Sequence, residues 1–166
     1  NGRHRLKYGG QYIYHIYTTS TVEVNSGDTQ FNIETPPKLH AHEGALYVMD
    51  DFDVTENFRI NAGLRFTTFH HVGPFTLYQL DDQGRTSGKV EYKPGKPISS
   101  YSALEPRLSM RYITGKNSSV KASFNQGQQY VHLASFSSIA LPTDVWIPSS
   151  TNVKPQIGTQ YSAGYF

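Results

Sequence analysis

Polar and apolar residues alternate along five segments of the chain, the pattern of β-strands whose two faces meet different surroundings. In residues 58–67, FRINAGLRFT, every second residue from Phe58 to Phe66 is apolar, and the residues between them include Arg59 and Arg65. The same alternation recurs in residues 6–16, 104–112, 120–125 and 157–165. Residues 43–52 alternate less regularly and fit a strand or a short buried helix; their neighbours favour a strand. The sequence therefore predicts an all-β chain of about six strands.

The segments between these strands are of two kinds, and the two kinds alternate. Residues 53–57 and 115–118 are short polar turns, whereas residues 18–38, 71–98 and 132–155 are long connections, predicted without strands of their own. Structureless loops of this length are uncommon in a soluble domain. Short turns at one end and long loops at the other are expected of a transmembrane β-barrel. We therefore predict a segment of an antiparallel up-and-down transmembrane β-barrel.

The alternation alone leaves open which face is wet. In a soluble sandwich the apolar rows pack on a second sheet, whereas in a barrel they contact lipid and the polar rows face the interior. Tyrosines recur on the apolar rows, where a ring fits the interfacial layer and its hydroxyl stays hydrated. They are Tyr12, Tyr14, Tyr112, Tyr161 and Tyr165. About six strands are fewer than the smallest usual barrel has, so we expect the chain to supply part of a larger one.

The composition narrows the classes of function. The chain has 15 basic and 13 acidic residues spread along its length, which gives no basic patch for nucleic acid. It has no cysteine, so neither a disulfide framework nor a thiolate metal site is expected. No run of about 18 apolar residues occurs, so no transmembrane helix is expected.

Several short motifs, taken in order, resemble the β-barrel of TonB-dependent outer-membrane receptors, in particular members of the Bacteroidetes type. Residues 47–52, YVMDDF, and residues 58–66, FRINAGLRF, are similar to a double strand of that family. Residues 104–109, LEPRLS, resemble its EPR strand, and residues 144–150, 153–156 and 160–165 resemble a later loop and strand. The order and spacing of these motifs extend the resemblance from residue 4 to residue 166.

The resemblance implies a barrel of roughly 22 strands, plugged by an N-terminal domain, that imports a nutrient across the bacterial outer membrane. We expect residues 1–166 to belong to one such barrel domain, without the plug domain. The implied partners are outer-membrane lipids, the plug, the remaining strands and the TonB–ExbB–ExbD complex, with a surface lipoprotein left open. No cofactor and no enzymatic activity are expected. Phe166 fits either a terminal assembly signal or an internal strand; the resemblance favours the internal strand, and hence a truncated chain.

Two groups of residues are candidates for contact with a plug or a nutrient. The lumen-facing candidates are Arg59, Arg65, Glu105, Arg107, Arg111 and Lys121. The alternative for them is a solvated charge ladder, with Glu105 paired to an arginine across the sheet. The substrate-contact candidates in the long connections are Phe75, Tyr78, Phe136 and Trp146. Such aromatic residues, like Tyr101 and Tyr130, either stack on a ligand or pack the loops together.

Histidines and acidic residues give weaker signals. His40 and His42 share a face if they lie on a strand, and His70–His71 lies near the same end, but no metal-binding motif accompanies them, so no metal site is predicted. The acidic residues 50–53 are expected in water at a strand end, and residues 81–84 at a loop tip. No catalytic motif is found. A passive porin-like channel and a surface-exposed structural or adhesion protein stay open as alternatives.

Overall fold

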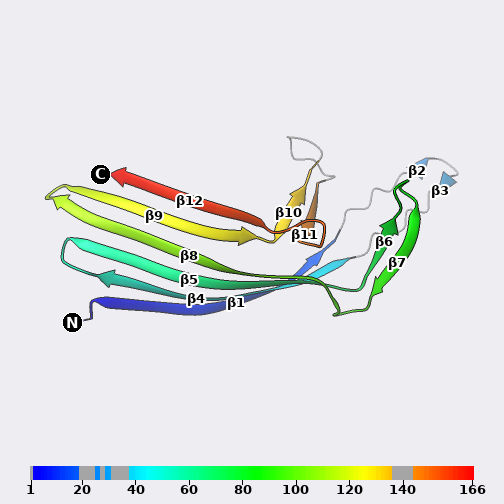
Figure 1. The fold of residues 1–166 in the computed structure, drawn as a ribbon, viewed down its shortest axis with the longest axis horizontal. Helices are drawn as coiled ribbons and strands as arrows, with labels where there is room; N and C mark the ends of the chain where they lie inside the picture. Colours follow the sequence, from blue (N-terminus) through cyan, green and yellow to red (C-terminus); the bar gives the residue numbers. More distant parts are fainter. Residues whose placement is uncertain (1, 19–24, 27–28, 31–37, 136–143) are drawn as a thin grey trace.

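The described residues of the computed structural model, 2–18, 25–26, 29–30, 38–135 and 144–166, form one long six-stranded sheet and three short hairpins. The sheet has the order β1-β4-β5-β8-β9-β12, and neighbouring strands are antiparallel (Figure 1). Its strands are β1 (His4–Tyr17), β4 (Leu39–Asp53), β5 (Phe58–Val72), β8 (Pro97–Gly115), β9 (Ser118–Gln129) and β12 (Gln156–Tyr165). The predicted up-and-down arrangement of six strands is therefore confirmed. The sheet is open, with β1 and β12 at its two edges.

The long connections contain strands, so the prediction that they lack them was wrong. Within the described residues, the hairpins are β2 (Asn25–Ser26) with β3 (Thr29–Gln30), β6 (Phe75–Leu80) with β7 (Thr86–Tyr92), and β10 (Val131–Ala134) with β11 (Val145–Pro148). The hairpin of β6 and β7 is stabilised by a hydrogen-bonded turn at its tip. The Asp81 carboxylate accepts hydrogen bonds from the backbone N–H groups of Gln83 (2.9 Å) and Arg85 (2.8 Å), and Gly84 has a φ of 76°.

The strands are longer than the alternation predicts. β4 begins at Leu39 rather than at residue 43, because residues 39–42 pair with β1, and His40 and His42 also pair with β5. The turn between β4 and β5 is short and held locally: the Thr55 hydroxyl oxygen accepts hydrogen bonds from the N–H groups of Asn57 (3.3 Å) and Phe58 (3.0 Å). No described residue belongs to a helix long and apolar enough to cross a membrane.

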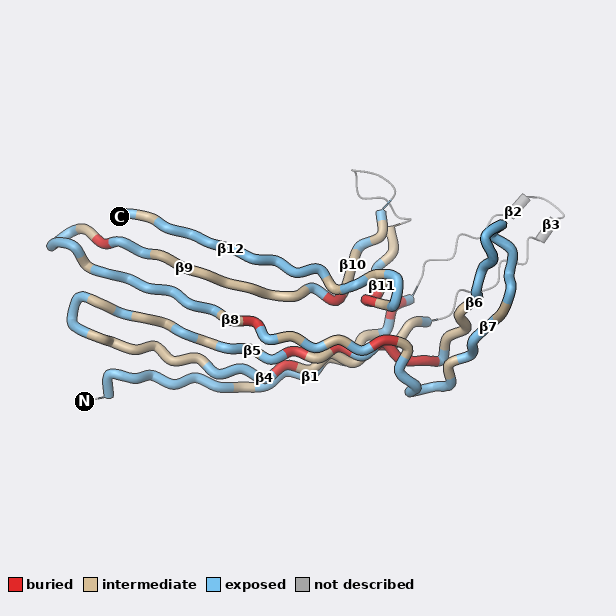
Figure 2. Tube along the Cα trace, viewed as in Figure 1, coloured by how far each residue is buried: buried red, intermediate tan, exposed pale blue. Residues whose placement is uncertain are grey.

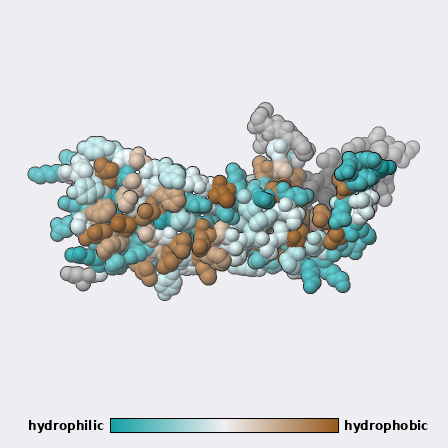
Figure 3. Space-filling model, viewed as in Figure 1, coloured by the Kyte–Doolittle hydropathy of each residue, from teal (hydrophilic) through white to brown (hydrophobic). Residues whose placement is uncertain are grey.

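The register sorts the side chains of the sheet onto an apolar face and a polar face, because every directly opposed pair projects to the same side. One rung of the apolar face consists of Tyr8, Val48, Leu64 and Pro106. Large apolar side chains on this face are exposed: Leu46 is 66 % and Leu104 is 59 % exposed. Apolar side chains gather over the half of the sheet away from the hairpins (Figure 3). A water-soluble sheet would cover such a surface with a second layer, and the described residues supply none.

A small packed cluster lies on the polar face, near the end of the strands that leads into the long connections. Its buried members are Tyr17, Ala41, Phe69 and Tyr130. The rings of Phe69 and Tyr130 stack with centroids 5.1 Å apart. The buried stretches gather mainly where the strands approach the hairpins, and the rest of the sheet is exposed or half-buried (Figure 2). The fold is therefore a thin sheet with a core at one end.

Candidate functional site

The polar face brings together the charged residues singled out in the sequence. Arg59, Arg111 and Lys121 lie directly opposite one another on β5, β8 and β9. Arg107 lies two rungs further along the same face. The opposed pair Arg65 and Glu105 occupies the rung after that. All six predicted residues therefore share one face, on three neighbouring strands.

Glu105 is the centre of a buried polar network on this face. Glu105 is only 4 % exposed. One of its carboxylate oxygens accepts hydrogen bonds from the Thr67 hydroxyl (3.2 Å) and from the Gln128 backbone N–H (3.1 Å). The other oxygen lies 3.9 Å from Nε of Arg65. Thr67 also shares a hydrogen bond of 2.7 Å with the Tyr130 hydroxyl. The network ties β5, β8 and β9 together beside the packed cluster.

A proline explains why the carboxylate of Glu105 reaches β9. Pro106 has no N–H to give to a neighbouring strand, and the ladder between β8 and β9 ends at the next residue, Arg107. Beyond that point β9 pairs with β12 alone, up to Gln129. Glu105 takes the backbone N–H of Gln128 where the ladder would have continued.

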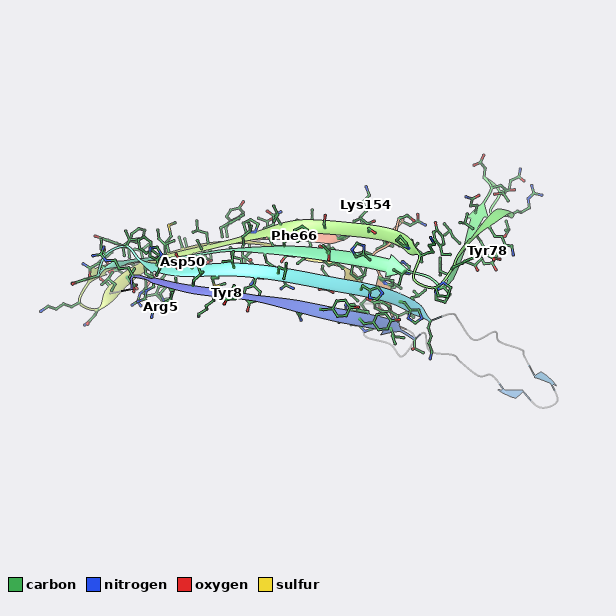
Figure 4. The ribbon with its side chains drawn as sticks, turned by 90° about the horizontal axis from the view of Figure 1, so that it is seen from below. Arg5, Tyr8, Asp50, Phe66, Tyr78 and Lys154 are labelled. Carbon is green, nitrogen blue, oxygen red and sulfur yellow. The ribbon has the colours of Figure 1, made fainter. Side chains whose placement is uncertain are left out.

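The cations of the polar face differ in their partners. Near the short turns, Arg59 contacts Asp53 at 2.5 Å, and Arg5 lies 3.4 Å from Asp51 and 3.5 Å from Asp53. These contacts are exposed, and exposed ion pairs contribute little to stability. Figure 4 shows Arg5 at this end of the sheet.

Arg107 and Arg111 have no carboxylate partner within the described part of the chain. Lys121 lies over the ring of Phe166, with Nζ 4.2 Å from the ring centroid. Like charges opposite one another across strands repel. Arg111, which lies between Arg59 and Lys121 and has no carboxylate of its own in the described part of the chain, is therefore suited to an anionic group brought in from outside this sheet.

A pocket of about 420 Å³ opens on the polar face where β9 separates from β8. Gly127 and Gly158 lie opposite each other there, and no side chain fills the space above them. The pocket is edged by the amides Asn125, Gln129, Gln156 and Gln160, with Arg65, Arg107 and Glu105 on the β5–β8 side. Oδ1 of Asn125 and Nε of Arg65 are buried without hydrogen-bond partners in the described structure. Asn125 therefore leaves an unused acceptor at the pocket wall, whereas Nε of Arg65 faces the Glu105 carboxylate 3.9 Å away.

The connection after β11 folds over the polar face beside the packed cluster. The Ser99 hydroxyl donates to the carbonyl of Ser149 (3.1 Å), and the Tyr101 hydroxyl donates to that of Ser150 (2.6 Å). The Ser149 N–H donates to the carbonyl of Tyr130 (2.7 Å). Tyr101 and Tyr130 therefore pack and anchor the connection.

The substrate-contact candidates of the long connections are not brought together. Tyr78, on the hairpin that projects beyond the sheet (Figure 4), is 61 % exposed. Trp146 on β11 is 55 % exposed. The ring of Phe75 lies 5.9 Å from that of His71, beside a second pocket of about 200 Å³. Phe136 lies outside the described residues. On the same hairpin as Tyr78, a hydrogen bond from Lys89 (2.7 Å) holds the pKa of Glu91 below its usual value.

The histidines and acidic residues are distributed over both faces. His40, His42 and His70 lie on the apolar face, whereas His15 lies on the polar face, 3.0 Å from Glu43. No group of three or more His, Asp or Glu side chains is placed to hold a metal ion within the described residues. Asp50 projects to the apolar face, near the end of β4, where its carboxylate lies 2.6 Å from Nδ1 of His4.

Sequence reasoning missed Thr67, Asn125 and Gln128 as parts of the site. Thr67 and Asn125 fall on the polar rows of the alternation, which was the available signal for them. Gln128 acts through its backbone N–H, and nothing in its identity marks that role.

Comparison with protein families agrees with this geometry. The family model described as TonB dependent receptor-like, beta-barrel, matches residues 1–165. No curated protein and no solved structure matches the chain significantly. The apolar face is thus the lipid-facing side of a transmembrane β-barrel segment. The chain belongs to the TonB-dependent receptor family, whose members act as transporters in the outer membrane of Gram-negative bacteria, together with a plug domain and TonB, and are not enzymes.

Proposed function

We propose that this chain is part of an active transporter that binds a nutrient at its long connections and imports it with energy from the TonB–ExbB–ExbD complex. The observation that carries the proposal is the family match over residues 1–165. The segregation of the two faces supports it, because a plugged barrel needs a lipid-facing outside and a polar inside. The domain assignment, residues 1–166 within one barrel and the plug elsewhere in the protein, is part of the proposal, as is the Bacteroidetes type.

The polar face is proposed as the lumen wall. Among the residues that the structure describes, Arg107 and Arg111 lack a carboxylate partner, and Oδ1 of Asn125, at the pocket beside Arg107, lacks a hydrogen-bond donor. Peptide groups and acidic side chains of the plug would meet both needs. Arg59, Arg65, Glu105 and Lys121 would hold the wall in shape through the contacts described above.

The outer ends of the long connections are proposed as the nutrient-contacting surface. Tyr78 and Trp146 present exposed rings there, whereas Tyr101 and Tyr130 are committed to packing. Phe75 and Phe136 complete the proposed set. Exposed aromatic rings bind sugars, chelates and peptides by stacking, so the chemistry of the nutrient stays open among these classes.

The test is uptake by cells that carry the complete receptor, with iron chelates, cobalamin, glycans or peptides supplied singly as the limiting nutrient. One of these nutrients should support growth with TonB present and fail to support it when TonB is deleted, while surface binding persists. Uptake of equal rate with and without TonB would contradict active transport and indicate a passive channel. A surface lipoprotein partner would appear by co-purification with the receptor.

A further inference from the structure

Hydrogen-bonding side chains occupy a single rung of the lipid-facing side across four neighbouring strands. Tyr14, His42, His70 and Ser100 lie directly opposite one another on β1, β4, β5 and β8. His40 lies on the next rung toward the long connections, opposite Ile16. The sequence signals for nutrient transport do not account for this group, which we call the His–Tyr patch: Tyr12, Tyr14, His40, His42, His70 and Ser100.

Each imidazole of the patch is held through Nδ1. The Tyr12 hydroxyl lies 2.6 Å from Nδ1 of His42, and the Tyr14 hydroxyl 2.8 Å from Nδ1 of His40. Nδ1 of His70 lies 2.9 Å from the Ser100 hydroxyl. The ring of Tyr14 also stacks on that of His42, with centroids 4.9 Å apart. In the described structure no residue hydrogen-bonds Nε2 of these three histidines, so each ring is fixed on one side and free on the other.

The patch lies on the lipid-facing side, between the apolar rungs and the start of the long connections. Two rungs closer to the short turns, the same face carries Leu46, Phe66 and Leu104, and apart from Asp50 and His4 the residues of this face that follow on β1, β4 and β5 are apolar or aromatic. Free polar groups are too costly to hold in hydrocarbon, whereas Tyr and other amphipathic rings are favoured at the interface. The long connections follow directly, so the patch lies in the headgroup layer on their side of the membrane.

We propose that the His–Tyr patch binds the phosphate of a membrane lipid headgroup. In the proposed arrangement each hydroxyl donates to Nδ1 and the ring proton is on Nε2, so that His40, His42 and His70 each present an N–H to the headgroup layer. Phosphate oxygens are strong acceptors, and hydrogen bonds to an ionised acceptor are stronger than those to a neutral one. Asp50, an acidic residue on this face, lies toward the opposite end of the strands beside His4, where it does not repel a phosphate. A lipid is the occupant because the patch is continuous with the lipid-facing rows.

The test compares two lipids that differ only in the phosphate. The complete receptor, purified in a neutral detergent, is titrated with phosphatidic acid and with diacylglycerol of the same acyl chains, and bound lipid is counted by native mass spectrometry. Wild-type receptor should retain phosphatidic acid preferentially. The double variant His42→Phe/His70→Phe keeps the rings and removes two donors, so its affinity for phosphatidic acid should fall by about tenfold or more.

Two further variants make the result specific. His4→Phe is the matched control, the same substitution on the same face at the other end of the strands, and should leave retention of phosphatidic acid unchanged. His42→Arg/His70→Arg restores donors and should recover binding, which a merely misfolded patch would not do. Equal retention of the two lipids by wild-type receptor, or unchanged retention by the double Phe variant, would overturn the proposal. Equally tight binding of inorganic phosphate would assign the patch to a free anion instead of a lipid.

Discussion

Arg65 and Glu105 lie directly opposite each other on β5 and β8, with Nε of the arginine 3.9 Å from the carboxylate. Glu105 also accepts hydrogen bonds from Thr67 and the backbone of Gln128. We predict that Glu105→Ala lowers the free energy of unfolding by about 1.5–3 kcal/mol, because buried donors and a cation lose their acceptor. Glu105→Gln, which keeps an acceptor oxygen, should lose less. Urea unfolding of the receptor from lipid bilayers measures both, and an Ala variant of wild-type stability would contradict the network.

The packed cluster on the polar face predicts a larger effect at Phe69, which is 0 % exposed and stacked on Tyr130. Phe69→Ala should lower the free energy of unfolding by about 3–5 kcal/mol, since it leaves a cavity. Tyr130→Phe keeps the ring stack and loses only the hydrogen bond to Thr67, so its cost should be about 0.5–1.5 kcal/mol. The same unfolding experiment ranks them. Equal losses in the two variants would show that the cluster is not packed as described.

Because the apolar face contacts lipid, we predict that a charged side chain is tolerated on the polar face of the sheet and not on the apolar face. Leu64 lies in the middle of the apolar rows and is 44 % exposed, so Leu64→Arg should lower the free energy of unfolding in a bilayer by about 2–4 kcal/mol. Ser109→Arg places the same side chain on the polar face and is the matched control. It should change stability much less. A reversed order of the two variants would mean that the faces have been assigned the wrong way round.

We predict that substitution of Trp146 weakens nutrient binding and leaves folding unchanged. Its ring is 55 % exposed on β11, and loss of one stacking contact costs about 0.5–1.5 kcal/mol. Trp146→Ala should therefore weaken nutrient binding to cells about two- to tenfold. Leu133→Ala, directly opposite Trp146 on β10, is the control and should leave affinity unchanged. Equal affinity of the Trp146→Ala variant and wild-type receptor would remove Trp146 from the proposed surface.

The sequence predicted the sheet well because alternation reports directly on the two faces. Phe58, Ile60, Ala62, Leu64 and Phe66 all project to the apolar face, as the period of two requires. The ends of the strands were less predictable. Residues 39–42 belong to β4 through pairing with β1, but there the polar residues His40 and His42 lie on the apolar face and the apolar Ala41 on the polar face, the reverse of the pattern along residues 58–67.

The candidate site was predictable in its residues and not in its contacts. The alternation placed Arg107 and Glu105 on one face, but the contact between Glu105 and the N–H of Gln128 depends on the end of the β8–β9 ladder at Arg107, next to Pro106. The folding of Ser149 and Ser150 over Ser99 and Tyr101 is a contact between distant segments, which local pattern does not report.

Spin-label accessibility in bilayers is the most direct test of which face meets hydrocarbon. Labels at Leu64, Phe66 and Leu108 on the apolar face, and at Ser109 and Ser123 on the polar face, sample both sides of the sheet. The first three should be relaxed by oxygen dissolved in the lipid, and the other two should be less accessible to it. Labels at Leu64, Phe66 and Leu108 that are reached by a water-soluble nickel complex and shielded from oxygen would contradict the account.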